Sequence, residues 1–163
     1  MGSRLMRCLM FALATSSTTS CAKPNGTTPV PCPSYELTSI AGADGVIFPS
    51  GSGWVDGYPH GAITRFWTPS IQDVRVAESR LYEYLKTTAP LLADKLQAYA
   101  RQYTGFYSSE RRLIFIQFLG PSSWIRDWRC RPVSVDDGGD TFFQVEYDVD
   151  LGVFRNLQVN GNG

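Results

Sequence analysis

His60 is the only histidine in the chain, and it lies in the glycine- and proline-rich stretch DGYPHGA (56–62). Loops of this composition often carry functional side chains. Asp56 is near enough in sequence to orient the imidazole, and a serine could then act as the nucleophile of a hydrolase. However, no G-x-S-x-G elbow is present, and a lone histidine without a placed partner is usually an ordinary loop residue. A zinc site is weaker still, because one histidine and few free cysteines do not complete a ligand set.

Two acidic stretches that contain glycine could offer oxygen ligands to a cation. In VDDGGDTFFQV (135–145) three aspartates surround two glycines, and in YDVDLG (147–152) the acids follow a D-x-D-x-G pattern. Neither stretch has the spacing of a calcium loop, since further acids and the distal glutamate are missing. Asp-Gly and Gly-Gly instead suit the positive φ angles of tight turns between strands. We therefore predict hairpin turns at both places, and we expect neither a metal nor a cofactor.

A run of arginines and tryptophans between residues 124 and 131 offers a different chemistry. The guanidinium groups could donate hydrogen bonds, and the indole rings could serve as platforms, for an anionic ligand, a glycan or a peptide. The alternative is a sheet face with ordinary packing and with salt bridges to neighbouring acids. The loop GSGWVDGYPHG (51–61) is a second candidate for binding. The candidate ligand-binding residues are Trp124, Arg126, Trp128, Arg129 and His60.

The N-terminal residues follow the order of an export signal. Arg4 and Arg7 form a short basic start, CLMFALA (8–14) is apolar, and TSSTTSC (15–21) is small and polar. The apolar run is too short to span a bilayer but fits the hydrophobic region of a signal peptide. The alternative is a frayed amphipathic helix. We predict export, with residues 1–20 as the signal peptide.

TTSC (18–21) resembles the lipobox of bacterial lipoproteins, whose cysteine is acylated and becomes the mature N-terminus. Cys21 is therefore the candidate lipidation site, and residues 21–34 have the composition of a flexible tether. Ala22 is not the aspartate of inner-membrane retention, so we expect an outer-membrane lipoprotein in a bacterial envelope, facing the periplasm or the surface. The alternative is an ordinary secretory signal, cut near Ala14 or Ala22, that releases a soluble protein.

The cysteines fit the same interpretation. Cys8 would leave with the signal and Cys21 would carry lipid, so Cys32 and Cys130 remain as a candidate disulfide. An exported protein meets an oxidising compartment, which favours such a bond between the tether and the domain. The alternative is two unpaired thiols, because their distance is not visible in the sequence.

The composition bounds the size of the domain and the class of partner. The chain has 163 residues, of which 43% are hydrophobic, and this suits one domain with a sizeable core, placed at residues 35–163. Removing Arg4 and Arg7 with the signal leaves 13 of the 15 basic residues against 15 acidic ones, a net charge of −2. Nucleic-acid binders carry a basic excess, so we expect no nucleic-acid partner.

Hydrophobic spacing predicts a helical segment followed by strands. Thr68 is the expected N-cap, Pro69 fits the first helical position and Gly105 is the expected C-cap. Pro90 interrupts the pattern, so residues 69–104 form either one long kinked helix or two helices. The expected fold class is α+β, with this helical layer packed on an antiparallel four-stranded meander. One earlier strand is expected at 45–49, and the strands of the meander are expected at 111–119, 124–135, 141–149 and 153–161.

The order of several segments resembles a group of small exported bacterial proteins and predicted lipoproteins. The segments that carry the resemblance are FWTPSIQDVRVAESRLYEYL, YARQYTGFY, RRLIFIQFL, then a tryptophan, VDDGGDTFFQVEYD and GVFRNLQVNGNG. The group shares Y-x-R-Q-Y-x-G, an apolar strand, D-G-G-x-x-[FY]-F-x-V and a terminal V-N-G. The resemblance covers about residues 66–161, and it implies export and a common fold with no catalytic residue. A helix followed by a meander is also similar to cystatin-like and NTF2-like folds, although the inhibitory hairpins of cystatins are absent, so protease inhibition is not implied.

Together these patterns favour an exported, lipid-anchored envelope protein whose domain is non-enzymatic and has a binding or structural role. Its partners would be the membrane, reached through the lipid, and a protein or small molecule. The first alternative is a cystatin/NTF2-like module that binds a small ligand or a peptide on the concave face of its sheet. The second alternative is a hydrolase that uses His60.

Overall fold

The computed structural model describes residues 36–40, 42–55, 57, 62–121, 125 and 127–161. The chain divides into two compact units, Met1–Val30 and Pro31–Gly163, and the described residues all belong to the second unit. The predicted signal peptide and most of the predicted tether therefore fall outside the second unit, and neither is described. Within the described ranges, no helix is both long enough and apolar enough to cross a membrane.

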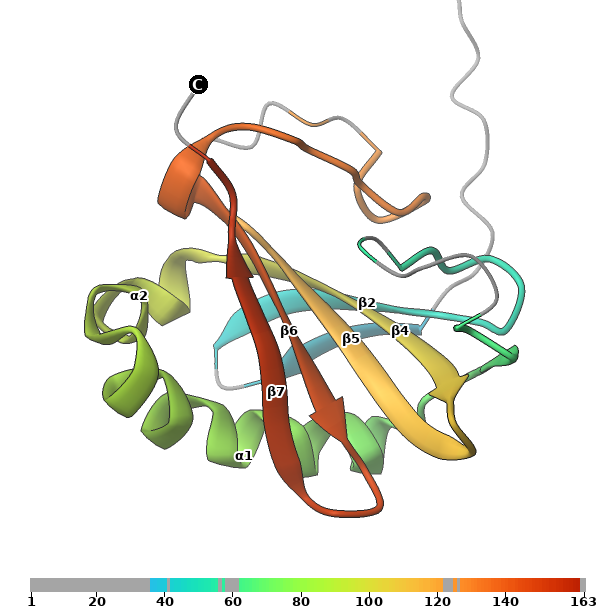
Figure 1. The fold of residues 1–163 in the computed structure, drawn as a ribbon. Coiled ribbons are helices and arrows are strands. Elements are labelled where there is room, and N and C mark those ends of the chain that lie inside the picture. The colour runs from blue at the N-terminus through green and yellow to red at the C-terminus, as the bar shows by residue number, and fades with distance from the viewer. Residues whose placement is uncertain are drawn as a thin grey trace, which may run out of the picture. The chain divides into compact units, whose positions relative to one another are not determined.

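The described residues form an α+β fold, which confirms the predicted class. Their strands make one mixed sheet in the order β1-β2-β4-β5-β6-β7, with β3 also paired to β4. The β2–β4 pairing is parallel and the other strand pairings are antiparallel. Figure 1 shows α1 crossing one side of this sheet. The elements are β1 (Glu36–Ile40), β2 (Ala43–Phe48), β3 (Arg65–Trp67), α1 (Ile71–Thr88), α2 (Pro90–Lys95), the 3-10 turn η1 (Leu96–Ala98), β4 (Ala100–Ser108), β5 (Arg111–Leu119), the 3-10 turn η2 (Gly139–Thr141), β6 (Phe142–Asp148) and β7 (Val153–Val159).

The first helix begins two residues later than predicted. Ser70, not Thr68, is the N-cap of α1, because Ser70 and Asp73 exchange hydrogen bonds with each other's backbone N–H groups in a capping box. The hydroxyl of Thr68 instead accepts a hydrogen bond of 2.9 Å from the backbone N–H of Ser50. The break predicted at Pro90 is present, since α1 ends at Thr88 and α2 begins at Pro90.

The helical segment does not continue to residue 104, so this part of the prediction is wrong. Strand β4 begins at Ala100, and Gly105, the predicted C-cap, lies inside it. The steps of four and three that link Leu92, Leu96, Tyr99 and Tyr103 are helical, but from Tyr99 onward the chain also alternates between two faces. Pairing with β2 and β5 decides between these readings, because sheet contacts override local propensity.

Residues 124–135 were predicted to be a strand, and this prediction is also wrong. Residues 127–130 form a turn in which the backbone N–H of Cys130 donates to the carbonyl of Asp127 at 2.7 Å. Asp127 has a φ of 63°, a left-handed conformation that interrupts an extended chain. Strands β4 to β7 do run antiparallel in chain order, but β4 takes the place of the missing strand and the sheet is wider. The long kinked helix on a four-stranded meander is therefore not confirmed.

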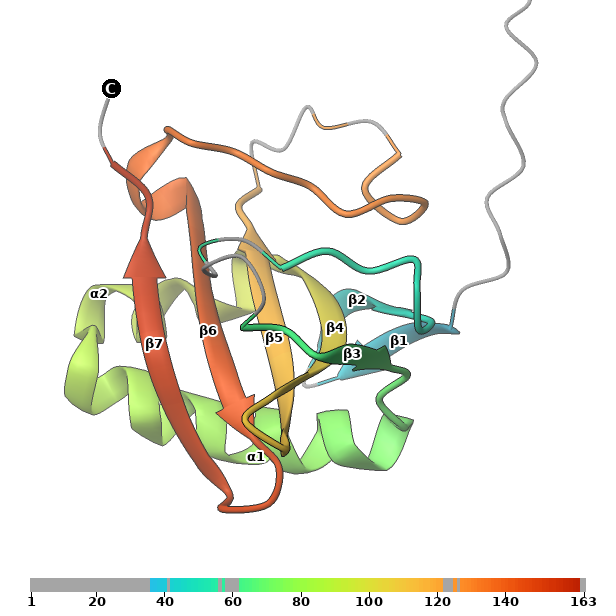
Figure 2. The ribbon, with the colours of Figure 1, turned by 45° about the vertical axis from the view of Figure 1, so that its right-hand side comes forward.

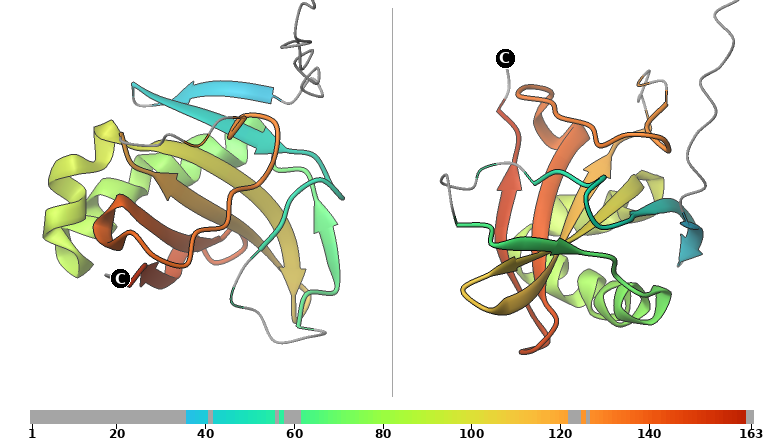
Figure 3. Two further views of the ribbon diagram at one scale, coloured as in Figure 1. Left: turned by 90° about the horizontal axis from the view of Figure 1, so that it is seen from above. Right: turned by 90° about the vertical axis from the view of Figure 1, so that its right-hand side faces the viewer.

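The two faces of the sheet have different covers. On one face, Tyr103, Ile116 and Val145 pack with Leu81 and Leu85 of α1 in the main hydrophobic core. The opposite face is called the outer face below, and its side chains alternate with those of the core. Figure 2 shows the segments 49–55 and 127–135 on the side of the sheet away from α1. The right-hand view of Figure 3 shows the same separation of α1 from residues 127–135.

The acidic corner at residues 136–140 is a turn, but it is not the predicted hairpin between two strands. Gly138 and Gly139 have φ angles of 112° and 55°, which other residues rarely adopt. Their backbone N–H groups donate to the carbonyl of Gly161 at 3.1 and 2.9 Å. The side-chain amide of Asn160 donates to the carbonyl of Val135. The corner therefore leads into β6 and is held by the residues that follow β7.

Candidate functional site

The sequence-predicted site residues fall partly outside the described residues. His60, Trp124, Arg126, Cys21 and Cys32 belong to this group. The predictions that rest on them, namely catalysis by His60, lipidation and the Cys32–Cys130 pairing, stay predictions. Trp128, Arg129 and Cys130 are described, and Cys130 is disulfide-bonded.

Trp128 and Arg129 lie in the turn at residues 127–130 and not on a strand. The guanidinium of Arg129 lies 4.2 Å from the centre of the Trp128 ring, and its Nη2 lies 2.6 Å from a carboxylate oxygen of Asp44. The arginine is thus half-exposed and already paired with an acid. This contact tethers the turn to β2, in agreement with the ordinary salt-bridge alternative for this stretch.

A shallow surface pocket of about 340 Å³ lies beside Asp44. The polar side chains in its lining belong to Asp44, Gln97 and Tyr99. The Tyr99 hydroxyl is occupied, since it donates to the backbone carbonyl of Asp140. The pocket offers few side-chain groups to a ligand. The residues that line it are Gly42, Ala43, Asp44, Gln97, Ala98, Tyr99 and Ala100.

Four glutamines form a continuous line across the outer face, which we call the glutamine row. Gln102 on β4 is paired in register with Gln117 on β5, Gln117 with Gln144 on β6, and Gln144 with Gln158 on β7. Adjacent strands lie about 4.8 Å apart, so the row spans roughly 14 Å. All four side chains lie on the outer face, because their chain neighbours Tyr103, Ile116, Phe118, Phe143 and Val145 belong to the core beneath α1.

The exposure of the glutamine row increases from β4 to β7. Gln102 and Gln117 are buried, with exposed fractions of 2% and 8%, Gln144 is half-buried and Gln158 is exposed. Gln102 has a structural role. Its amide nitrogen donates to the carbonyls of Trp128 and Arg131, and its amide oxygen accepts a bond of 2.9 Å from the backbone N–H of Val133. Gln102 therefore holds the 128–133 segment against the sheet.

Gln117 differs from its neighbours. Within the described part of the chain its amide has no hydrogen-bond partner, although 92% of the residue is buried. Gln144 and Gln158 bond to each other, with the Gln144 nitrogen donating to the Gln158 oxygen at 2.8 Å. This leaves the Gln144 oxygen and the Gln158 nitrogen without partners among the described residues. A buried polar side chain without a partner costs stability and calls for a functional or solvent explanation.

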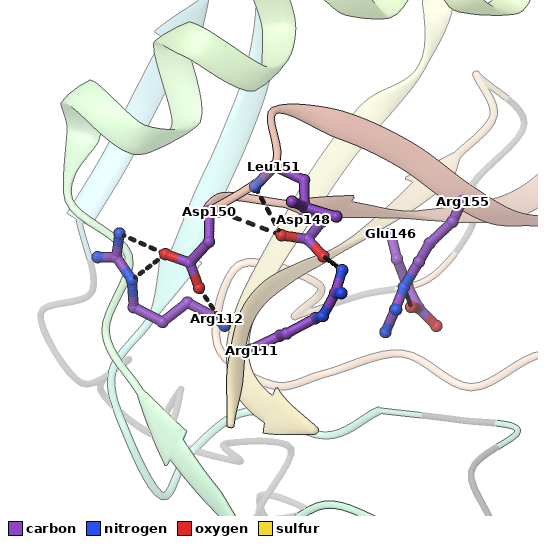
Figure 4. Close-up of polar contacts among 7 residues, drawn as sticks. All are labelled: Arg111, Arg112, Glu146, Asp148, Asp150, Leu151 and Arg155. Atoms are coloured by element: carbon purple, nitrogen blue, oxygen red, sulfur yellow. Dashed lines mark hydrogen bonds and ion pairs between the residues drawn. The ribbon is translucent and has the colours of Figure 1, made fainter. Parts of the chain in front are cut away.

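The next residues along the outer face carry charges that are paired. Arg155 on β7 donates from Nε to a Glu146 oxygen at 2.9 Å, and Arg111 on β5 lies 3.1 Å from Asp148. Figure 4 shows the two pairs together with the bonds of the neighbouring Asp150. Glu146 and Asp148 are buried, so the partners neutralise charges that solvent does not reach. The outer face beside the glutamine row therefore carries no net charge from these groups.

Residues 53–55 and Gly57 lie over the same face. A Cβ atom at Gly53 would collide with the Thr104 side chain on β4, and Val55 packs with Phe115 of β5. Gly57 lies next to the Gln158 amide, because a Cβ atom placed on Gly57 would be 3.6 Å from the amide oxygen of Gln158. Gly53 is required here because the backbone approaches β4 so closely.

The two acidic stretches do not form a cation site in the described residues, where no group of three or more potential ligands converges. Asp140 pairs with Lys95 at 2.7 Å. In YDVDLG, Asp148 accepts the backbone N–H groups of Asp150 and Leu151 at 3.1 and 2.9 Å, which closes the β6–β7 turn (Figure 4). The backbone N–H and the guanidinium of Arg112 bind Asp150 and lower the pKa of its carboxyl. This stretch is the hairpin turn that the sequence predicted.

Side chains of the main hydrophobic core fill the space between α1 and the sheet. Phe118 and Phe143 stack there with their ring centres 4.0 Å apart. Glu78, Arg101 and Tyr103 form a buried polar cluster in the same layer. Burial raises the pKa of Glu78, and burial together with the neighbouring Glu78 raises the pKa of Tyr103 well above its usual value. These groups do not reach solvent, so we assign them to stability.

No protein-family model, curated protein or solved structure matches this chain. Sequence reasoning missed the glutamine row, because its members lie 14 to 27 residues apart along the chain, and their alignment depends on the register of four strands. The available signal was one glutamine on each of these four strands, on the face opposite Tyr103, Phe118 and Phe143.

Proposed function

We propose that this protein is an exported, lipid-anchored envelope protein whose α+β domain binds a polar ligand on its outer face without catalysing a reaction. The observation that carries the proposal is Gln117, which is buried at the centre of the glutamine row and has no partner among the described residues. A ligand that reaches the row from the β7 side would supply the missing hydrogen bonds. A purely structural domain gains nothing from such a side chain.

The paired charges favour binding over catalysis. A general acid or base must reach the substrate with a pKa suited to the proton transfer. Glu146 and Asp148, the carboxylates nearest the row, are held by Arg155 and Arg111. Amide side chains do not titrate, so the row can position a ligand but cannot transfer protons. A hydrolase that uses His60 remains the alternative, and it lacks support from the described residues.

A relation to cystatin-like or NTF2-like folds remains a hypothesis. Its support is the position of α1 across one face of the antiparallel strands β4 to β7. The filled core under α1 favours the outer face as the place for the ligand in such a module. The resemblance to small exported bacterial proteins likewise stays a hypothesis.

The bonded state of Cys130 supports export, because disulfides persist mainly in oxidising compartments. Lipid anchoring is tested by metabolic labelling with radioactive palmitate. We expect label on the wild-type protein and none on Cys21→Ser, with Cys8→Ser as the matched control that keeps the label. Equal labelling of Cys21→Ser and wild type would show that Cys21 is not the lipidated residue and would contradict this part of the proposal.

Binding is tested through the side-chain amide signals of the glutamines in a nitrogen-15 NMR spectrum of the exported protein. Adding the soluble polar fraction of an envelope extract should shift the signals of Gln117 and Gln144. The signal of Gln72, an exposed glutamine on α1, should stay in place. Shifts confined to Gln72, or no shifts at all, would contradict binding at the outer face.

A further inference from the structure

The glutamine row also indicates the chemical class of the ligand, and this inference rests on the proposed function. We infer that the row binds a neutral oligosaccharide that lies across strands β5 to β7. Three features indicate this class: the hydrogen-bond donors and acceptors of the row, the charges around it and the edge strand beside it.

The amides of the glutamine row can both donate and accept hydrogen bonds. A primary amide presents a donor and an acceptor in one plane, a few ångströms apart. Adjacent hydroxyl groups of a sugar ring both donate and accept, so one amide can bind two of them at once. Gln117 offers both of its groups, Gln144 offers its oxygen and Gln158 offers its nitrogen.

The two ion pairs beside the glutamine row leave no net charge on these groups. Glu146 is paired with Arg155, and Asp148 with Arg111, so each carboxylate has its own guanidinium. An anionic ligand would meet these carboxylates, and a cationic ligand would compete with the arginines that hold them. A neutral ligand meets neither penalty. Its desolvation cost is also lower than that of an ion.

The edge strand β7 favours a sugar over a peptide as the ligand. Extended peptides usually bind to a sheet by adding a strand to its edge through backbone hydrogen bonds. The edge strand β7 is irregular, because the β6–β7 register shifts between Gln144 and Glu146 and Asn156 has a φ of 52°. Such a bulge twists an edge away from further pairing. The edge therefore opposes an added peptide strand, and the side-chain row is left as the recognition surface.

An exposed aromatic residue, Trp54, lies in the segment that covers the outer face. Trp54 is 45% exposed and lies between Gly53, which contacts Thr104, and Val55, which packs on β5. The C–H groups on the face of a sugar ring pack well on an indole, and Trp suits such a place because it is apolar with one polar N–H. From Gln117 to Gln158 the row spans two strand spacings, roughly 10 Å, which suits a short oligosaccharide.

The inference is tested with the exported protein on an array of neutral glycans, followed by calorimetric titration of the strongest ligand. We expect binding by the wild type and a loss of at least about tenfold in affinity for Gln117→Met and for Gln144→Met. The matched control Gln72→Met removes an exposed amide from α1 and should bind like the wild type. Trp54→Ala should weaken binding as well.

Two outcomes would overturn the inference. One is an array on which no neutral glycan binds the wild type, and the other is a glycan whose affinity is the same for Gln117→Met and wild type. If the envelope extract shifts the Gln117 and Gln144 signals while no glycan binds, the proposed binding function stands and the sugar assignment falls. If neither extract nor glycan acts on the row, both fall.

Discussion

The guanidinium of Arg101 on β4 lies 3.1 Å from the carboxylate of Glu78 on α1, and neither side chain reaches solvent. Arg101 also donates to the backbone carbonyls of Tyr99 and Leu96 at 2.7 and 3.2 Å. The hydroxyl of Tyr103 donates to the same Glu78 oxygen at 2.9 Å. The end of the helical segment, the start of β4 and the middle of α1 are thereby joined by one buried network. Such a network fixes the position of the helix on the sheet only if each of its members has a partner.

Removing one partner of this pair should be strongly destabilising. We expect Arg101→Met to lower the free energy of unfolding by about 3–5 kcal/mol, because Glu78 is left buried without its cation. Urea denaturation followed by tryptophan fluorescence measures the change. The control is Arg75→Met on the exposed side of α1, which should change stability by less than about 0.5 kcal/mol. Equal effects of the two substitutions would show that the buried pair does not matter for stability.

The same cluster should make stability depend on pH. Burial raises the pKa of Glu78 above its usual value of 4.5, against the opposing effects of Arg101 and Tyr103, so the folded protein holds this proton more tightly than the unfolded chain. The stabilisation that this proton provides is complete below the pKa of Glu78 in the unfolded chain. It is lost as the pH rises through the pKa of Glu78 in the folded protein. We expect the stability of wild type relative to Glu78→Gln to fall as the pH rises from about 4.5, the usual value, through the raised pKa of Glu78. A constant or rising difference across this range would contradict the raised pKa.

Two glutamines of the row provide a matched pair of substitutions with opposite expected results. Gln102→Met removes three hydrogen bonds to the 128–133 segment and should cost about 2–4 kcal/mol of stability. Gln117→Met replaces a buried amide without a partner by an apolar side chain of similar size. It should leave stability unchanged or raise it by up to about 1 kcal/mol. A large loss for Gln117→Met in thermal or urea unfolding would mean that its amide supports the fold and would weaken its assignment to a ligand.

Local patterns in the sequence predicted much of the fold. The alternating runs 141–149 and 153–161 correspond to β6 and β7, since their periodicity matches a strand. The short apolar run 111–119, which Gly120 and Pro121 end, corresponds to the central strand β5. The break at Pro90 is also local, because the proline ring is incompatible with the preceding helical turn.

The errors came from places where distant contacts decide between two local possibilities. Tyr99 to Thr104 fits a helix by spacing, but β2 and β5 lie on either side of it and make it a central strand. The stretch 124–135 has an alternating pattern, yet Gln102 binds the backbone of residues 128–133 and Asp127 adopts a left-handed conformation. The glutamine row depends on the register of four strands and was not predictable from any one of them.

The partner of Cys130 gives a further test. Cys130 is disulfide-bonded, and the other cysteines of the chain are Cys8, Cys21 and Cys32, none of them among the described residues. We expect peptide mapping without reduction to recover a cross-linked Cys32–Cys130 peptide. A Cys21–Cys130 peptide would instead exclude the acylation of Cys21 in those molecules. Cys130→Ser should lower stability by about 2–4 kcal/mol in the same buffer without reductant.

The β6–β7 turn separates two aspartates that look alike in the sequence. Asp148 is fully buried, accepts two backbone N–H groups of the turn and pairs with Arg111 (Figure 4). Asp150 is half-exposed and binds Arg112 across the β5–β6 ladder. We expect Asp148→Ala to cost about 3–5 kcal/mol, because buried donors lose their acceptor, and Asp150→Ala to cost about 1 kcal/mol or less because solvent replaces its partner. Adding calcium should change the melting temperature of neither variant nor of the wild type, since each carboxylate is already bound by a guanidinium and by backbone N–H groups. Calcium stabilisation of the wild type that is lost in Asp148→Ala would show instead that the turn is a cation site.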